Sequence, residues 1–202
     1  MFRATDVVKH LLIINVLMFF GTGLLGSHIQ TMLAVFFPTS PFFQPYQLVT
    51  HMFMHGDLTH LFFNMFALYM FGSPLEALWG PRRFLFYYFF SGFGALALHL
   101  LVMYLELRSG AMPPEMMNVP MLGASGAVFG LLAGYGMMFP NSILQLLFPP
   151  IAMKAKYFVV LYAVLELVFG VGNMVQGVAH FAHVGGALFG FLLIVYWRKF
   201  GR

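Results

Sequence analysis

Six apolar segments, each close to the roughly 20 residues that cross the hydrocarbon core of a bilayer, follow one another along this chain. They are predicted at Val8–Leu25, Leu58–Trp79, Phe84–Leu107, Leu122–Phe139, Tyr157–Val171 and Val178–Trp197. No polar stretch between them is long enough for a soluble domain, and no internal repeat is apparent. We therefore expect an all-α membrane protein in which residues 1–202 form a single transmembrane domain.

Composition excludes several other classes of protein. Charged residues make up 8% of the chain, whereas soluble domains carry about 25%. The net charge of +4 does not indicate nucleic-acid binding, because the basic residues stand in small groups between apolar segments. The absence of cysteine excludes disulfides. Arg3 and Lys9 precede the first segment as in a signal peptide, but no small-residue cleavage site follows, so a retained anchor is expected.

The basic residues predict the orientation of the chain. If the six segments alternate in direction, nine of the ten Lys and Arg residues fall on one side of the membrane: Arg3, Lys9, Arg82, Arg83, Lys154, Lys156, Arg198, Lys199 and Arg202. Only Arg108 falls on the other side. The positive-inside rule then puts both termini in the cytoplasm. The small size and the lack of an organelle-targeting sequence predict a bacterial inner membrane.

Four polar residues far apart in sequence are expected at a similar depth below the outer surface. His60 and Asn64 begin the second segment, Ser125 the fourth and His183 the sixth, and all three segments run inward. Each residue lies within about two helical turns of the outer end. Polar side chains in lipid are costly and are functional candidates by default. A hydroxyl and an imidazole within hydrogen-bond reach would form a nucleophile and its base.

Glycines predict which segments touch. After Ser125, Gly126, Gly130 and Gly134 recur at every fourth residue, as Gly186 and Gly190 do after His183. Such stripes allow membrane helices to approach closely, which would carry Ser125 toward His183. In the alternative interpretation the glycines only pack helices and Ser125 bonds to carbonyls of its own helix.

His60 and Asn64 stand four residues apart and therefore share a helical face. Both can donate hydrogen bonds to the oxyanion that develops during acyl transfer. The backbone N–H of Ser125, at a helix start, is a further donor. The alternative is that the pair merely bridges two helices.

The chain resembles the rhomboid intramembrane serine proteases over essentially its whole length. The resemblance rests on three motifs in the family's order: His60 and Asn64 as His-x-x-x-Asn, Gly123 to Gly126 as Gly-x-Ser-Gly followed by Gly130, and Ala182, His183, Gly186 and Gly190 as Ala-His-x-x-Gly-x-x-x-Gly.

The resemblance implies a six-helix bundle with a partly submerged first outer loop, here Gly26 to Asp57. It implies that Ser125 is the nucleophile and His183 the base, in a dyad without a carboxylate. His60, Asn64 and the Ser125 amide would form the oxyanion hole. The substrates would be transmembrane segments of other proteins in the lipid bilayer, cut near the outer face without a metal or cofactor.

Two positions depart from the family pattern. Tyr46-Gln47 stands where many members have Trp-Arg, which puts a loop-anchoring salt bridge in doubt. Phe129 stands where some relatives have a tyrosine that stacks on the catalytic histidine. A phenylalanine would keep this ring stack without the hydroxyl; in the alternative interpretation it is only a residue of the hydrophobic core. No acidic residue is evidently placed to orient His183. Glu166, His51 and His55 are assigned no role.

Two other classes of function remain as alternatives. A metal-dependent hydrolase could use His180 and His183 with His55 and His60, although the chain has no His-Glu-x-x-His motif. A non-catalytic rhomboid-like protein would hold membrane clients, although such proteins usually lack the serine or the histidine that this chain keeps.

Overall fold

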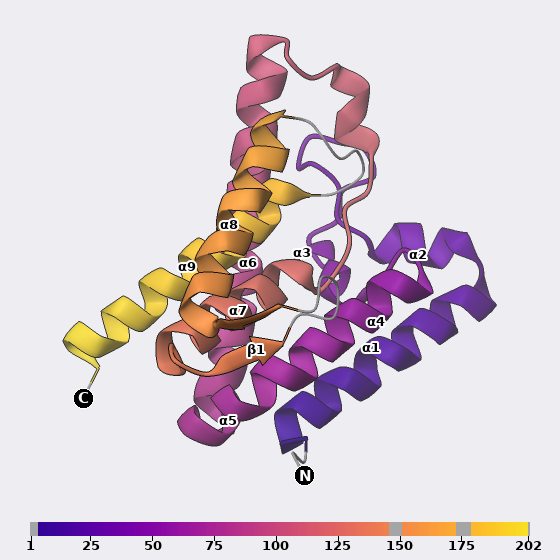
Figure 1. Ribbon diagram of the computed structural model, residues 1–202. Helices are drawn as coiled ribbons and strands as arrows, with labels where there is room; N and C mark the ends of the chain where they lie inside the picture. Colours follow the sequence, from indigo (N-terminus) through magenta and orange to yellow (C-terminus); the bar gives the residue numbers. More distant parts are fainter. Residues whose placement is uncertain (1–3, 146–150, 173–178, 202) are drawn as a thin grey trace.

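The computed structural model describes residues 4–145, 151–172 and 179–201, and these are mainly helical (Figure 1). The long helices are α1 (Asp6–Leu25), α6 (Pro81–Ser109), α8 (Ala155–Gly172) and α9 (His180–Phe200). The second apolar segment comprises α4 (Leu58–Ala67), a π-helical turn (Leu68–Gly72) and α5 (Ser73–Trp79). The fourth is α7 (Ser125–Met138). The shorter elements are α2 (Ser27–Leu33), α3 (Gln47–Thr50), two 3-10 turns (His51–Phe53 and Pro114–Asn118) and the strands β1 (Ile143–Gln145) and β2 (Ala152–Lys154).

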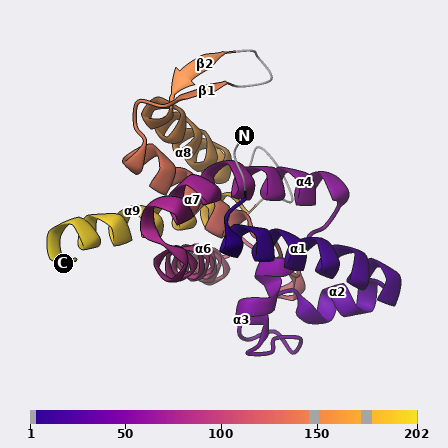
Figure 2. The same ribbon diagram turned by 90° about the horizontal axis from the view of Figure 1, so that it is seen from below.

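The predicted all-α membrane bundle is confirmed. Within the described ranges, five helical segments are long and apolar enough to cross a membrane. The remaining segment, α7, has 14 residues and is therefore about 21 Å long, shorter than a hydrocarbon core of about 30 Å. Ten of its residues are buried, because α4, α6, α8 and α9 all pack around it (Figures 1 and 2). Because α7 is shorter than the core of a bilayer, its two ends cannot both reach the membrane surfaces.

Several predicted helix limits differ from those of the structure. The fourth segment begins at Ser125 rather than at Leu122, because Gly123 has a φ of 131°, which ends any helical path before it. The third begins at Pro81, where the missing proline N–H is tolerated in the first turn. The predicted start of the sixth segment, Val178, lies outside the described residues, and α9 begins at His180.

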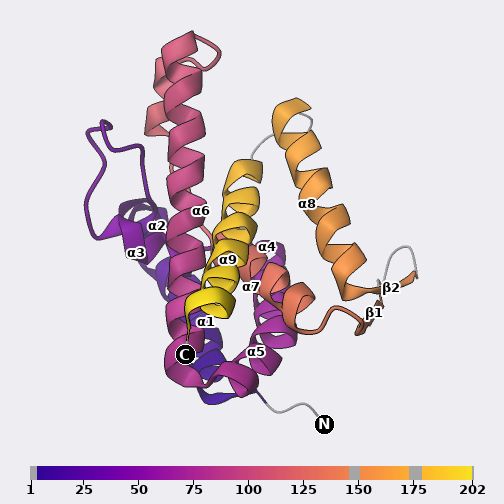
Figure 3. The same ribbon diagram turned by 90° about the vertical axis from the view of Figure 1, so that its left-hand side faces the viewer.

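The helices alternate in direction, as their order along the chain requires. At one end of the bundle, the N–H groups of Val7 and Val8 donate to the Glu76 carboxylate at 2.9 Å. At the same end Arg83 covers the Trp197 ring at 4.1 Å, and Trp79 packs against Trp197. The beginnings of α1 and α6 therefore meet the ends of α5 and α9, in the lower part of Figure 3. The basic residues Arg83, in the first turn of α6, and Arg198, in the last turn of α9, both lie at this end.

The segment between α1 and α4 folds into a compact loop beside these helices (Figures 1 and 2). Gln47 is 1% exposed, and its amide nitrogen donates to the carbonyls of Met32 and Phe42 at 3.0 and 3.1 Å. At the position where a loop-anchoring salt bridge had been in doubt, the neutral side chain of Gln47 thus holds the loop by hydrogen bonds. A backbone bridge between Val35 and Met121 ties this loop to the segment that precedes α7.

The hairpin of β1 and β2 was not anticipated. The two strands pair antiparallel, with Leu144 opposite Met153, and extend away from the helices in Figure 2. Three-residue strands are too short for a reliable alternating pattern, so sequence offered little signal for them.

Candidate active site

Ser125 is the first residue of α7, and its surroundings are set by Gly123. A Cβ atom built on Gly123 would lie 2.9 Å from Cε1 and 3.1 Å from Nε2 of His60, and 3.5 Å from Ser125 Oγ. The hydroxyl and the His60 ring therefore border the same small space, which a glycine leaves open. The Gly123 N–H donates to the carbonyl of His51 at 2.9 Å, so the outer loop holds this turn in place.

His60 and Asn64 lie on α4, one helical turn apart. Asp57 caps this helix, since its carboxylate accepts from the His60 N–H at 2.8 Å. Nδ1 of His60 faces the Gly56 N–H at 3.4 Å and so acts as an acceptor, which places the proton of the neutral ring on Nε2, the nitrogen nearest Gly123. Asn64 is 5% exposed, and one of its amide hydrogens is donated to the His60 carbonyl at 2.9 Å. Its second amide hydrogen has no partner within the described residues.

His183 lies in the first turn of α9 and stacks on Phe129, with ring centroids 4.1 Å apart and planes 6° apart. Phe129 follows Ser125 by four residues and shares its helical face, so His183 lies beside that face. On its other side Phe129 stacks on Tyr162 of α8, with centroids 5.3 Å apart. Within the described part of the chain, no hydrogen bond joins Ser125 Oγ to the His183 ring. The two residues are related through Phe129, which stacks on His183, and through the packing of α7 on α9.

Glycines allow α7 and α9 to meet backbone to backbone. A methyl group at Gly186 would overlap the carbonyl oxygen of Gly126. One turn further along, a Cβ at Gly130 would lie 3.2 Å from the Gly186 carbonyl, and a Cβ at Gly190 would lie 3.1 Å from the Gly130 Cα. The glycines of the two stripes thus contact each other across the helix pair, and α9 lies between α6 and α8 (Figure 3).

The carboxylate of Glu166 lies beside the His183 imidazole, a contact that the sequence did not predict. Glu166 of α8 places Oε2 2.6 Å from Nδ1 of His180 and 3.0 Å from Nδ1 of His183. An acidic residue thus lies beside His183, where the sequence had indicated none. The only available signal was a single acid in an otherwise apolar segment. Glu166, His180 and His183 are also the described groups whose ligand atoms lie close enough to hold a metal, within 4.8 Å of one another.

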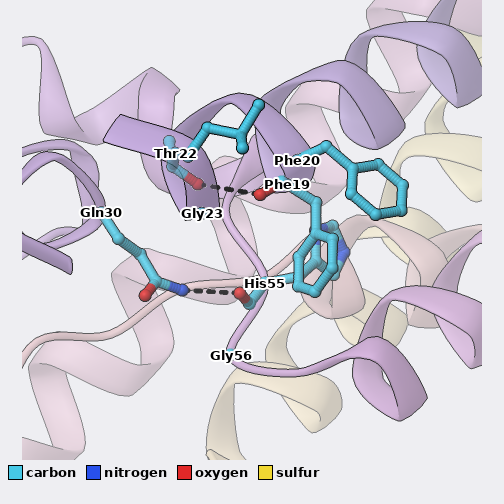
Figure 4. A pocket seen from close by; sticks show the side chains of 8 residues that line it. Phe19, Phe20, Thr22, Gly23, Gln30, His55 and Gly56 are labelled. Carbon is cyan, nitrogen blue, oxygen red and sulfur yellow. Dashed lines mark hydrogen bonds between the residues drawn. The ribbon is translucent and has the colours of Figure 1, made fainter. Parts of the chain in front are cut away.

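His55 of the outer loop forms a separate pair with His60 of α4. His55 is 1% exposed, and its ring meets that of His60 at 5.1 Å in a T-shaped arrangement. His55 also lines a pocket between the end of α1 and the loop, together with Phe19, Phe20, Thr22, Gly23, Gln30 and Gly56 (Figure 4). Gln30 donates to the His55 carbonyl at 2.6 Å and so holds this part of the loop (Figure 4). These contacts place His55 and His60 outside the Glu166 cluster.

Stability is expected to fall in acid because two histidines of this loop are buried. Burial lowers the pKa of His51 to about 4 and that of His55 to about 4, whereas an unfolded histidine titrates near 6.5. The unfolded chain therefore binds more protons between these values. Stability is fully present above pH ~6.5 and is lost as the pH falls toward 4, by up to about 1.4 kcal/mol per pH unit for each ring.

Thermal unfolding in detergent, followed from pH 7.5 to 4, measures this dependence. His51→Gln should flatten the curve, whereas His28→Gln, at an exposed position, should leave its slope unchanged. Parallel curves for wild type and His51→Gln would contradict the assignment.

Comparison with known proteins gives matches to a family model and to several relatives. The family model for the Rhomboid domain matches residues 43–200. The chain is 30% identical over 149 residues to Rhomboid protease AarA of Providencia stuartii. The aligned region covers 71% of this chain and 53% of that protein. It is 35% identical over 149 residues to RHOMBOID-like protein 4 of Arabidopsis thaliana. Here the aligned region covers 73% of this chain and 33% of that protein. The chain therefore spans about a third to a half of the length of these relatives.

Proposed function

Because this chain belongs to the rhomboid family, we propose that it is an intramembrane serine endopeptidase. It would cleave transmembrane segments of other membrane proteins near the outer face, with Ser125 as nucleophile and His183 as base. One observation carries the proposal. The Ser125 hydroxyl shares a small space with the His60 ring, and Phe129, one turn after Ser125, stacks on His183.

The chemistry follows from these groups. A substrate helix must unwind locally, because its backbone carbonyls are otherwise engaged in hydrogen bonds. Ser125 Oγ attacks the exposed carbonyl while the neutral His183 takes the hydroxyl proton. The oxyanion accepts hydrogen bonds from His60 Nε2, the free amide hydrogen of Asn64 and the Ser125 N–H. His183 then protonates the leaving amine, and water hydrolyses the acyl-enzyme with the same groups.

The proposed orientation places this chemistry on the outer side of a bacterial inner membrane. The end of the bundle that holds Arg83 and Arg198 would face the cytoplasm together with both termini. Ser125 is the first residue of α7, and Arg198 contacts the opposite end of that helix, at Met137. The partners would be single-span proteins in the same bilayer, and none of the steps uses a cofactor or nucleic acid.

Two alternatives lead to different results. A non-catalytic rhomboid-like binder would retain clients without covalent reaction at Ser125. A metal-dependent hydrolase has one observation in its favour, the cluster of Glu166, His180 and His183. Reaction of Ser125 with an electrophile, and its response to chelator, separates the three.

We expect a fluorophosphonate probe to label the detergent-solubilised protein at Ser125, as located by mass spectrometry. His183→Ala should slow labelling by about 100-fold or more, because the hydroxyl loses its base. A chelator should leave the labelling rate unchanged. Labelling confined to other serines, or abolished by chelator, would refute the serine mechanism.

A further inference from the structure

We propose that Glu166 is a positioning residue for His183, on the premise of the function proposed above. Its carboxylate would hold the His183 ring with the Nδ1–H toward α8 and with Nε2 free to take the Ser125 proton. The site would then consist of a serine, a histidine and a carboxylate on three different helices: Ser125 on α7, His183 on α9 and Glu166 on α8.

The distances support this arrangement. Oε2 of Glu166 lies 3.0 Å from His183 Nδ1 and 2.6 Å from His180 Nδ1. The His180 contact has hydrogen-bond geometry, whereas the His183 ring is not yet aligned as a donor. Catalytic hydrogen bonds often become aligned only when substrate binds. One carboxylate oxygen can accept from two N–H groups, since it carries two lone pairs.

The placement of Glu166 also requires an explanation that packing does not supply. Only three residues of α8, a helix that the structure describes in full, are buried: Ala155, Glu166 and Gly170. A carboxylate is costly to bury unless it is hydrogen-bonded, and an acid inside a membrane segment is a functional candidate. A leucine at this position would pack against α9 without such a cost.

The carboxylate settles which nitrogen of His183 carries the proton. A neutral imidazole has one N–H and one lone pair. Because an ionised carboxylate only accepts, the Nδ1 that faces it must hold the hydrogen, and Nε2 keeps the lone pair. When Nε2 takes the Ser125 proton, the resulting cation lies beside the negative carboxylate, which stays ionised throughout. The other titratable groups around this site are His60, His99, Tyr162 and His180.

The same three groups are a weaker candidate for a metal site. Two ligands of a tetrahedral zinc ion, each about 2.0 Å from the metal, lie about 3.3 Å apart. The 2.6 Å separation between Glu166 and His180 is too short for two ligands of one such ion and is that of a short hydrogen bond. His180 therefore holds the carboxylate, and the carboxylate holds His183.

The test compares Glu166→Gln and Glu166→Ala with the exposed control Glu115→Gln in cleavage of a single-span reporter. We expect kcat to fall about 100-fold or more in the alanine variant, as for loss of a triad carboxylate, with KM within about twofold of wild type. The isosteric glutamine should lower kcat as well, because its amide no longer selects the tautomer that carries the proton on Nδ1. Glu115→Gln should match wild type, and a chelator should change none of these rates.

Nitrogen-15 NMR of histidine-labelled protein supplies a measurement that a purely structural role would not change. His183, assigned by comparison with His183→Gln, should show a protonated Nδ1 and an unprotonated Nε2 in wild type, and a mixture of tautomers in Glu166→Gln. Should the alanine variant fail to fold, the glutamine variant alone decides. A glutamine variant with wild-type kcat and tautomer would overturn the role of Glu166, whereas equal cleavage by wild type and Ser125→Ala would overturn the proposed function itself.

Discussion

Gly186→Ala is expected to abolish cleavage and to destabilise the fold by about 3 kcal/mol or more, at the upper end of overpacking effects. The added methyl group would overlap the carbonyl oxygen of Gly126, which is backbone and cannot rotate away. The helices α7 and α9 must then separate, and His183 moves with α9. A displacement of about 1 Å between reacting groups can lower a rate by about 100-fold.

The same substitution at a position without neighbours is the matched control. Gly23 of α1 has no atom within 4 Å of its Cβ position. Gly23→Ala should therefore leave cleavage unchanged and raise stability slightly, because glycine is a poor helix former. Both variants are compared by thermal unfolding in detergent and by reporter cleavage. Wild-type stability and activity in Gly186→Ala would show that the two backbones are not in contact.

The helical segments could be predicted from sequence because a membrane requires long apolar runs. The second segment, predicted at Leu58–Trp79, has the same limits in the structure. The glycine spacing also predicted which helices touch, since Gly126 and Gly186 have no side chain to keep two backbones apart. These features are local, or repeat at the helical period, and can therefore be recognised in one sequence.

Features that depend on the three-dimensional arrangement could not be predicted in this way. Glu166 lies 17 residues before His183 on another helix, and only the packing of α8 on α9 shows that their side chains meet. The start of α7 was misplaced because Leu122 is as apolar as the helix, whereas the backbone of Gly123 is held by the outer loop. The role of Gln47 as a neutral anchor was likewise hidden, because its hydrogen bonds reach carbonyls that sequence does not place.

Ser125→Ala should remove cleavage altogether while leaving the fold intact. Ser125 Oγ makes no hydrogen bond within the described residues that the substitution would break. Alanine is also a good helix residue, so the unfolding temperature should change little. Loss of a serine nucleophile lowers kcat by about 10⁶-fold in the best-measured soluble protease. The predicted separation between stability and activity is therefore very large.

The most direct measurement is cleavage of a single-span reporter, with helix-destabilising residues near its outer end, in proteoliposomes. Wild-type protein should release a fragment cut near the outer end of the span, and Ser125→Ala should release none above background. Equal release by wild type and Ser125→Ala would contradict the assignment of Ser125 as the nucleophile of an intramembrane protease.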